Sequence, residues 1–221
     1  MRLGVVTDTQ DMSGTVLSEV PEFQVAEEEL RAVTESFAGD YMQVPPMYSA
    51  LKVNGKKLYE LAREGKTVER KPRPVHFYEI EILDIDFPLV RFRVTCSKGT
   101  YIRTLCHDIG EKLGCGAAME TLLRTKVGRF TLDDAITLAQ TEEAVRNGEI
   151  EQRILGIEEI LAEYPRVCCT KEGDRLLANG NPLVQALVNA EEKDGWIRMC
   201  NSEGSFAGVY QWDEKETDIF L

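Results

Sequence analysis

One stretch decides the fold of this chain: residues 97–104 read Ser-Lys-Gly-Thr-Tyr-Ile-Arg-Thr. Ahead of it, residues 90–96 alternate apolar and polar side chains, which predicts a strand with one buried face. Behind it, apolar residues recur at helical spacing up to Leu113, which predicts an amphipathic helix. The stretch is therefore a strand-to-helix junction, where free helix N–H groups, Lys98 and Arg103 can hold a phosphate beside the aromatic ring of Tyr101. Judged alone, these residues also fit an ordinary capped helix with a tyrosine at the edge of the core.

The pattern of the whole chain predicts an α+β domain over residues 1–163 and a small β-rich module over 164–221. Strands are expected over residues 3–6, 15–20, 74–84, 88–96 and 122–130. Helices are expected over 27–37 and 101–113, and a further helix is expected to open at Thr131-Leu132-Asp133-Asp134, which resembles a capping box. Asn54-Gly55 predicts a hairpin turn. In the second module, Trp196 and Trp212 are expected to form a small core.

The charge of the chain is unevenly distributed. The 221 residues carry a net charge of −12, which argues against binding to nucleic acid. The middle third is nevertheless basic, since residues 52–129 hold 16 Lys and Arg against 10 Asp and Glu. A solvated surface helix would mix the two signs more evenly. This third is interpreted as an RNA-contacting surface only because the neighbouring motifs point the same way.

The cysteines and histidines do not indicate a metal or a disulfide framework. Six cysteines show no Cys-x-x-Cys pair and there are two histidines, so no metal site is expected and the thiols are expected to be reduced. Cys106-His107-Asp108 does not predict nucleophilic catalysis, because three adjacent helical residues point about 100° apart. Without a long apolar run or a leader, the chain is expected to be a soluble, cytoplasmic protein with no membrane partner.

Several longer motifs occur in a fixed order: residues 7–14 (Thr-Asp-Thr-Gln-Asp-Met-Ser-Gly), 45–52 (Pro-Pro-Met-Tyr-Ser-Ala-Leu-Lys), 55–63, 110–117 and 122–124 (Leu-Leu-Arg). In this order they resemble the TruB-type tRNA pseudouridine synthases. The likeness is clear over residues 1 to 130 and weak beyond. Long motifs in a fixed order are specific where any one of them would not be.

The resemblance implies a pseudouridine synthase domain with a mixed, mainly antiparallel sheet flanked by helices, and a C-terminal module like a PUA domain. It implies an isomerase that converts uridine to pseudouridine at position 55, in the TΨC loop of tRNA, with no cofactor, and that acts as a monomer in its full-length form. Tyr101 would then touch the flipped nucleotide, Leu122 would form an apolar wall, and Arg103 would pair with the nucleophilic aspartate, with Asp11 close to Arg103. The RNA backbone would be contacted by Lys52, Lys56, Lys57, Lys98 and Arg124.

Two family segments are missing from these 221 residues: the Gly-His-Thr-Gly-Thr-Leu-Asp-Pro type loop with the nucleophilic aspartate, and a Lys-Thr-Tyr segment. The sequence is therefore expected to be an N-terminally shortened synthase that is inactive alone, with Leu3, Val5 and Val6 lacking neighbours in the sheet. A geometric difficulty is that Tyr101 and Arg103 would point about 200° apart on a regular helix.

Two other classes of function stay open. The chain could be a non-catalytic RNA-binding fragment, since it keeps the basic middle and lacks the nucleophile. It could also be a small-molecule enzyme that holds a phosphate at Gly99 or at the Gly114-Cys115-Gly116 turn. The second class is disfavoured, because neither turn has the Gly-Lys-Ser/Thr of a P-loop or the spacing of a dinucleotide fingerprint.

Overall fold

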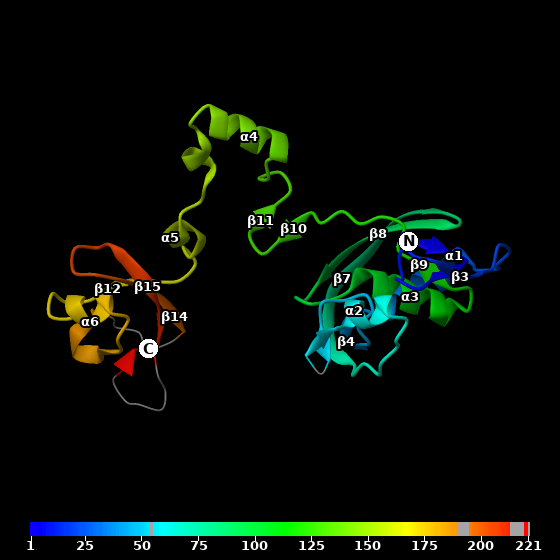
Figure 1. Cartoon of the computed structure of the whole chain (residues 1–221), viewed down its shortest axis with the longest axis horizontal. Coiled ribbons are helices and arrows are strands. Elements are labelled where there is room, and N and C mark those ends of the chain that lie inside the picture. The colour runs from blue at the N-terminus through cyan, green and yellow to red at the C-terminus, as the bar shows by residue number, and fades with distance from the viewer. Residues whose placement is uncertain (54, 190–194, 213–218, 221) are drawn as a thin grey trace. The chain divides into compact units, whose positions relative to one another are not determined.

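The structure is a computed structural model that describes residues 1–53, 55–189, 195–212 and 219–220. Its contacts divide the chain into two units, Met1–Leu132 and Asp133–Leu221. Each unit has its own hydrophobic core (Figure 1). The second unit begins before residue 164, where the C-terminal module is predicted to start. Among the helices in the described ranges, none is both long enough and apolar enough to cross a bilayer.

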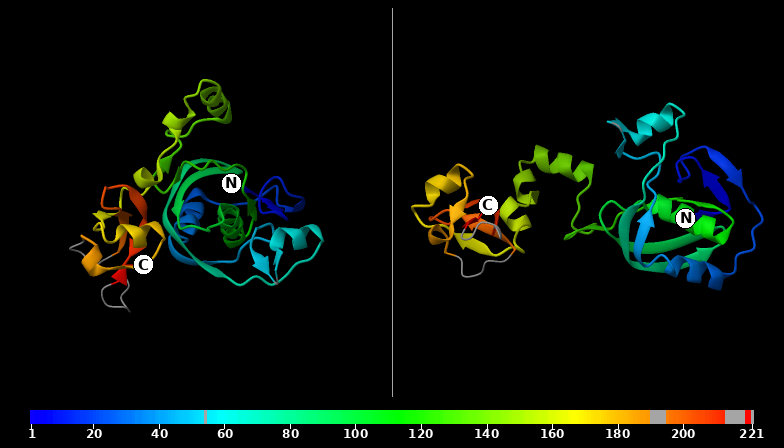
Figure 2. Two further views of the ribbon diagram at one scale, coloured as in Figure 1. Left: turned by 60° about the vertical axis from the view of Figure 1, so that its left-hand side comes forward. Right: turned by 90° about the horizontal axis from the view of Figure 1, so that it is seen from below.

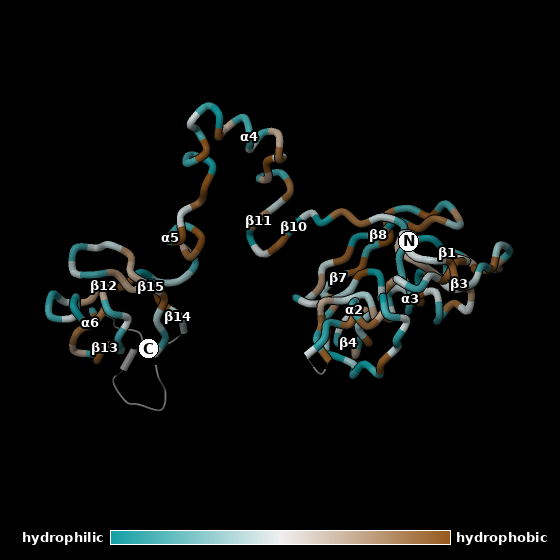
Figure 3. The backbone as a smooth tube through the Cα atoms, viewed as in Figure 1, coloured by the Kyte–Doolittle hydropathy of each residue, from teal (hydrophilic) through white to brown (hydrophobic). Residues whose placement is uncertain are grey.

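The first unit is built on a five-stranded sheet in which every neighbouring pair is antiparallel. In spatial order the strands are β4 (Gly39–Gln43), β7 (Arg73–Asp86), β8 (Leu89–Cys96), β1 (Arg2–Leu3) and β9 (Ala117–Ala118). Apolar stretches run along β7 and β8 (Figure 3). Because side chains alternate along a strand, one face of β7 buries Val75 and Phe77. The predicted α+β class with a mainly antiparallel sheet is confirmed.

Two helices cover the buried face of this sheet, α1 (Glu27–Glu35) and α3 (Ile102–Leu113). Figure 2 shows β7 and β8 curling around them. Leu30 of α1 and Leu105 and Ile109 of α3 are fully buried in the same core. At Gly110, a Cβ atom would lie 2.1 Å from the backbone nitrogen of Ala117. Only glycine therefore lets α3 approach β9 this closely.

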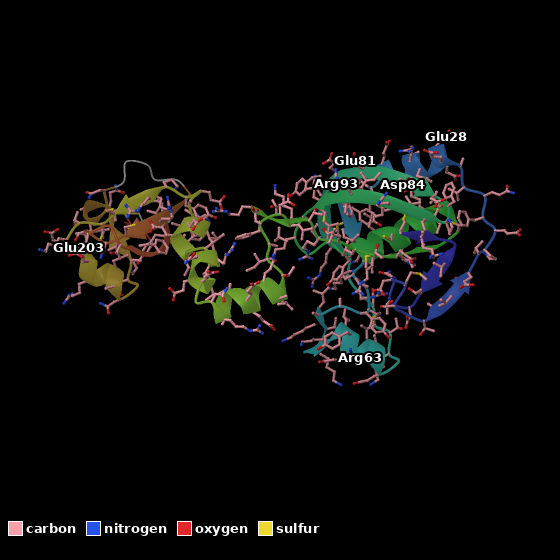
Figure 4. The ribbon with its side chains drawn as sticks, turned by 90° about the horizontal axis from the view of Figure 1, so that it is seen from above. Glu28, Arg63, Glu81, Asp84, Arg93 and Glu203 are labelled. Carbon is pink, nitrogen blue, oxygen red and sulfur yellow. The ribbon has the colours of Figure 1, made fainter. Side chains whose placement is uncertain are left out.

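The opposite face of the sheet is polar and open. On β7 and β8, Glu81 and Arg93 are directly opposite each other and form an ion pair with an Nη1 to Oε2 distance of 3.0 Å (Figure 4). Both side chains are about half exposed or more. Such exposed pairs contribute at most about 1 kcal/mol, so the sheet is stabilised mainly by its buried face.

The expectation that Leu3, Val5 and Val6 lack neighbours is wrong. Leu3 lies in β1, which fits between β8 and β9, and its side chain is buried. Val5 and Val6 belong to β2 (Val5–Thr7), which pairs with β3 (Val16–Glu19) in a hairpin. Leu3 has neighbours on both sides because β9, which follows α3 in the chain, pairs with the free edge of β1.

Residues 44–72 leave the sheet between β4 and β7, and we call this segment the basic arm. It contains a short hairpin of β5 (Lys52–Val53) and β6 (Lys56–Lys57), followed by α2 (Leu58–Arg63). Figures 2 and 4 show the arm projecting from the sheet. The predicted hairpin is confirmed. Asn54, half of the predicted Asn54-Gly55 turn, lies outside the described residues.

The segment after β9 differs from the sequence-based expectation. The strand expected over residues 122–130 is reduced to β10 (Lys126–Val127), which pairs with β11 (Phe130–Thr131). The helix expected to open at Thr131 is also wrong, because Thr131 is part of β11. The next helix is α4 (Leu138–Arg146), and its capping box is formed by Thr137 and Gln140.

The second unit contains a three-stranded sheet in the order β12 (Arg166–Cys168), β14 (Trp196–Cys200) and β15 (Phe206–Gln211). A second pair joins β13 (Leu183–Val184) to β16 (Ile219–Phe220). The helices are α4, α5 (Ile157–Ile160) and α6 (Asp174–Ala178), with short 3₁₀ turns at Ile150–Arg153 and Gln185–Leu187. Leu183 and Met199 are fully buried in its core, and Trp212 packs against it. Trp196 is 49% exposed, so its assignment to the core is wrong.

Candidate active site at the start of helix α3

The loop between β2 and β3 is folded around the carboxylate of Asp11. Oδ1 of Asp11 accepts hydrogen bonds from the Thr9 hydroxyl at 2.9 Å and from the backbone N–H of Ser13 at 3.1 Å, and also from the Ser13 hydroxyl. Gly14 lies against Thr9 within this loop, and a Cβ atom at position 14 would lie only 2.2 Å from Oγ1 of Thr9. The loop therefore holds one oxygen of Asp11 and leaves the other for a partner.

This loop is anchored to both β9 and α3. Backbone hydrogen bonds join Met12 N–H to the Met119 carbonyl and Met119 N–H to the Gln10 carbonyl, each at 3.0 Å. The hydroxyl of Thr104, buried in the first turn of α3, donates to Oε1 of Gln10 at 2.7 Å. The loop is thus fixed against the start of the helix.

Arg103 joins this loop to the basic arm. Its Nη1 donates to Oδ2 of Asp11 at 3.0 Å, and its Nη2 donates to the backbone carbonyl of Tyr48. The side chains of the ion pair are 22% and 16% exposed, so the pair is largely shielded from water. Asp108, further along α3, accepts from the Tyr41 hydroxyl at 2.9 Å.

The environment keeps Asp11 ionised. Burial by itself would raise the pKa of Asp11, but hydrogen bonds from Ser13, Thr9 and Arg103 to the carboxylate outweigh it and place the pKa below its usual value of 3.8. At neutral pH the site therefore contains a fixed anion and a fixed cation in contact.

Tyr101 lies immediately before α3 and is not part of the regular helix. As the N-cap residue it has φ −99° and ψ 107°, which is extended backbone. Its N–H donates to Oε1 of Gln43 at 2.8 Å, and Nε2 of Gln43 donates to its carbonyl at 3.1 Å. The angle of about 200° expected on a regular helix therefore does not apply to Tyr101 and Arg103.

The other predicted residues lie on separate segments of the first unit. Leu122 follows β9 and is 54% exposed, so it is not a core residue. Lys98 and Arg124 are exposed. On the arm, Lys52 and Lys56 are exposed, and Lys57 donates to the Tyr59 hydroxyl at 3.2 Å. The structure thus brings Asp11 and the carbonyl of Tyr48 together at Arg103, just after Tyr101 in the chain, and it leaves four of the five basic residues exposed.

Sequence reasoning missed Gln43, the Tyr48 carbonyl and the Thr104–Gln10 contact. A signal for Gln43 exists, because it occupies an inward-facing position in β4 where an apolar residue is expected. The Tyr48 contact uses a backbone carbonyl, for which the side-chain sequence carries no signal.

Cys106 and Asp108 of α3 are held in structural contacts. The thiol of Cys106 is buried in the core, and burial raises its pKa to about 12, so it stays protonated. Its neighbour Asp108 is engaged by Tyr41. The interpretation of Cys106-His107-Asp108 as non-catalytic is supported. Within the described ranges, no group of three or more His, Cys, Asp or Glu side chains is arranged to hold a metal ion.

Comparison with known proteins identifies the class. Residues 1–102 match the family "TruB family pseudouridylate synthase (N terminal domain)", and residues 103–162 match "tRNA pseudouridylate synthase B C-terminal domain". The fold agrees with a solved structure, the crystal structure of a Cbf5-Nop10-Gar1 complex, with a TM-score of 0.63 and 26% identity. That match covers 86% of this chain and 56% of the other. The matched family models and the fold are those of a pseudouridylate synthase.

Curated relatives specify the family. The tRNA pseudouridine synthase B of Clostridium novyi (strain NT) is 50% identical over 99% of this chain and 74% of its own length. The protein of the same name from Lachnoclostridium phytofermentans is 47% identical over 82% of this chain and 64% of its own length. The chain belongs to the TruB family, and the resemblance seen in its motifs is confirmed. It spans roughly two thirds to three quarters of the length of these two relatives.

Proposed function

We propose that this chain carries the arginine and tyrosine side of the active site of a tRNA pseudouridine synthase, which isomerises uridine at position 55 in the TΨC loop. The observation that carries the proposal is the placement of Arg103. This arginine follows Tyr101 by two residues and is held by hydrogen bonds to Asp11 and to the Tyr48 carbonyl. An arginine fixed in this way is poised to receive a carboxylate.

The reaction sets the roles of these residues. The N1 to C1′ glycosidic bond must break, the uracil must turn while bound, and C5 must join C1′. Tyr101 contacts the nucleotide taken out of its stack, and Leu122 forms an apolar wall beside it. Arg103 orients a nucleophilic aspartate and keeps it ionised. Asp11 holds Arg103 in place.

The RNA partner is tRNA, and surface cations bind the phosphate groups of its backbone. Those cations are Lys52, Lys56 and Lys57 on the arm, Lys98 ahead of α3, and Arg124 after β9. We further propose that residues 1–163 form the catalytic portion, that residues 164–221 form a small PUA-like RNA-binding module, and that the full-length protein works in the cytoplasm as a monomer.

The 221 residues alone are proposed to be inactive, because they contain no aspartate loop of the family type. The test compares the 221-residue chain with a chain extended upstream by that loop and the Lys-Thr-Tyr segment, using unmodified tRNA. The extended chain should form pseudouridine and the 221-residue chain should not. Isomerisation by the shorter chain would overturn the proposal that an upstream aspartate is needed, and inactivity of both chains would count against the proposed activity itself.

A second candidate, a non-catalytic RNA-binding fragment, is favoured by the basic arm together with the missing nucleophile. It predicts that the 221-residue chain binds tRNA, and that extension upstream adds affinity but no isomerisation. The same experiment therefore separates the two functions.

A further inference from the structure

Gln43 is a buried polar side chain with a single, specific set of partners. It is the last residue of β4, is 1% exposed, and faces the core side of the sheet. Both ends of its amide bind one residue 58 positions away: Oε1 accepts from the N–H of Tyr101 at 2.8 Å, and Nε2 donates to the carbonyl of Tyr101 at 3.1 Å. A buried amide is costly unless it is hydrogen-bonded, so this arrangement strongly favours one position for the Tyr101 backbone.

The helix start makes this contact necessary. Tyr101 is the N-cap of α3 and supplies no side-chain cap. Its backbone is extended, so neither the helix nor a neighbouring strand of the sheet provides a partner for its N–H. Gln43 supplies that partner, and it fixes both polar groups of the residue that connects β8 to α3.

The chain that follows Gln43 also contacts Arg103. Two prolines, Pro45 and Pro46, restrict the backbone, and Tyr48 then presents its carbonyl to Arg103. Residues 43–48 therefore hold Tyr101 at one end and Arg103 at the other, and so set the placement of the two relative to each other.

We propose that Gln43 is a positioning residue for the isomerisation: it fixes the backbone of Tyr101, and thereby the direction in which the tyrosine meets the target nucleotide. This inference rests on the proposed function. Gln43 is 1% exposed and would act through Tyr101. A role in stability alone would predict that an apolar side chain of similar size serves equally well once the protein is folded.

The first test examines the contact in the 221-residue chain. In Gln43→Met, the Tyr101 N–H loses its acceptor, so its amide hydrogen exchange should accelerate relative to other amides of α3, while the melting transition stays cooperative. Thr34→Val is a matched control, because Thr34 is also 1% exposed and its hydroxyl has no partner. Unchanged exchange at Tyr101 in Gln43→Met would show that the contact does not hold this backbone.

The second test measures rate and affinity separately in the chain extended with the aspartate loop. Misplacement of a substrate-contacting group by about 1 Å can cost up to about 100-fold in rate. Gln43→Met should therefore lower the single-turnover rate by about 10- to 100-fold and change the tRNA Kd by less than about threefold, and Thr34→Val should change neither. A normal rate in folded Gln43→Met, or a Kd that rises by the factor by which the rate falls, would overturn the inference.

The Gln43→Glu variant adds a pH readout and remains informative if the methionine variant does not fold. A neutral carboxyl can accept from the Tyr101 N–H and donate to its carbonyl, as the amide does, whereas an ionised one cannot donate. The rate of Gln43→Glu relative to wild type should therefore rise as the pH falls. A ratio independent of pH would contradict the inference. If the wild-type extended chain does not isomerise tRNA at all, the proposed function fails, and the exchange experiment still decides whether Gln43 holds Tyr101.

Discussion

Replacing Arg103 with lysine tests whether the site needs a planar, two-armed cation. In the structure the two terminal nitrogens of Arg103 serve two different acceptors, Oδ2 of Asp11 at 3.0 Å and the carbonyl of Tyr48. A lysine ammonium is one point charge on a flexible stem and lacks the fork that reaches both acceptors. Arg103→Lys should therefore keep the charge and lose one of the two contacts.

The structure sets the magnitude of the effect. One hydrogen bond to a charged group contributes about 1.5–3 kcal/mol, and the Arg103–Asp11 pair is shielded enough, at 22% and 16% exposed, for this range to apply. We expect the free energy of unfolding to fall by about 2 kcal/mol, which lowers Tm by about 4–8 °C for a chain of this size. Because lysine offers the reacting carboxylate a mobile point charge in place of a fixed, planar guanidinium, the single-turnover rate should fall by about 10- to 100-fold.

The assay separates catalysis from binding. Single-turnover isomerisation and tRNA Kd are measured in the chain extended with the aspartate loop, and Tm is measured in the 221-residue chain. Arg146→Lys is the matched control, since Arg146 forms an exposed pair with Glu142 on α4 and should change none of the three quantities.

Near-normal turnover in Arg103→Lys would remove Arg103 from the catalytic residues and show that a point charge suffices. A loss of affinity equal to the loss of rate would instead place Arg103 among the residues that bind the RNA backbone.

Three further predictions concern the arm, the loop and its carboxylate. Replacing Lys52, Lys56 and Lys57 together by alanine should weaken tRNA binding equally for all tRNA sequences and reduce the slope of log K against log salt by up to about 3; an unchanged affinity and slope would show a merely solvated surface. The folded-state pKa of Asp11 lies below 3.8, so its contribution to stability is complete above that pH and is lost as the pH falls through the lower folded value. The stability difference between wild type and Asp11→Asn, measured by urea unfolding, should therefore shrink below about pH 3.8, and a constant difference down to acid pH would contradict this. Gly14→Ala should destabilise the first unit by about 1–3 kcal/mol in urea, because its Cβ would lie 2.2 Å from Oγ1 of Thr9, whereas Gly156→Ala, where nothing lies within 4 Å, should cause no comparable loss.

Local patterns predicted much of the fold. The alternation before Ser97 and the helical spacing after Tyr101 correspond to β8 and α3, because burial of one face imposes the period on each element directly. The pattern failed where an element has little buried surface. The apolar side chains of residues 122–130 are not among those of the first core, and only Lys126, Val127 and Phe130 of this range pair, in the short hairpin of β10 and β11.

The site was predictable only in part. The contact between Arg103 and Asp11 was expected from the family motifs, and it joins residues 92 positions apart. The contacts of Gln43 with Tyr101 and of the Tyr48 carbonyl with Arg103 were not expected. It depends on tertiary proximity and on backbone groups, which composition and periodicity do not report.

The placement of the basic arm bears on how such a protein can be altered. The residues that flank the arm, Gln43 and Arg73, are cross-strand partners in β4 and β7. Within the arm, Nη1 of Arg70 donates to the carbonyl of Pro45 at 3.0 Å and so joins its two ends. The arm is thus an insertion whose ends meet at one point. Doubling the length of such a loop costs only about 0.6 kcal/mol of closure entropy. Provided that residues 44–48 and Arg70 are kept, the segment between them can be shortened, lengthened or exchanged. The RNA-binding residues of the arm can therefore change, in evolution or by engineering, while the residues that hold Arg103 stay the same.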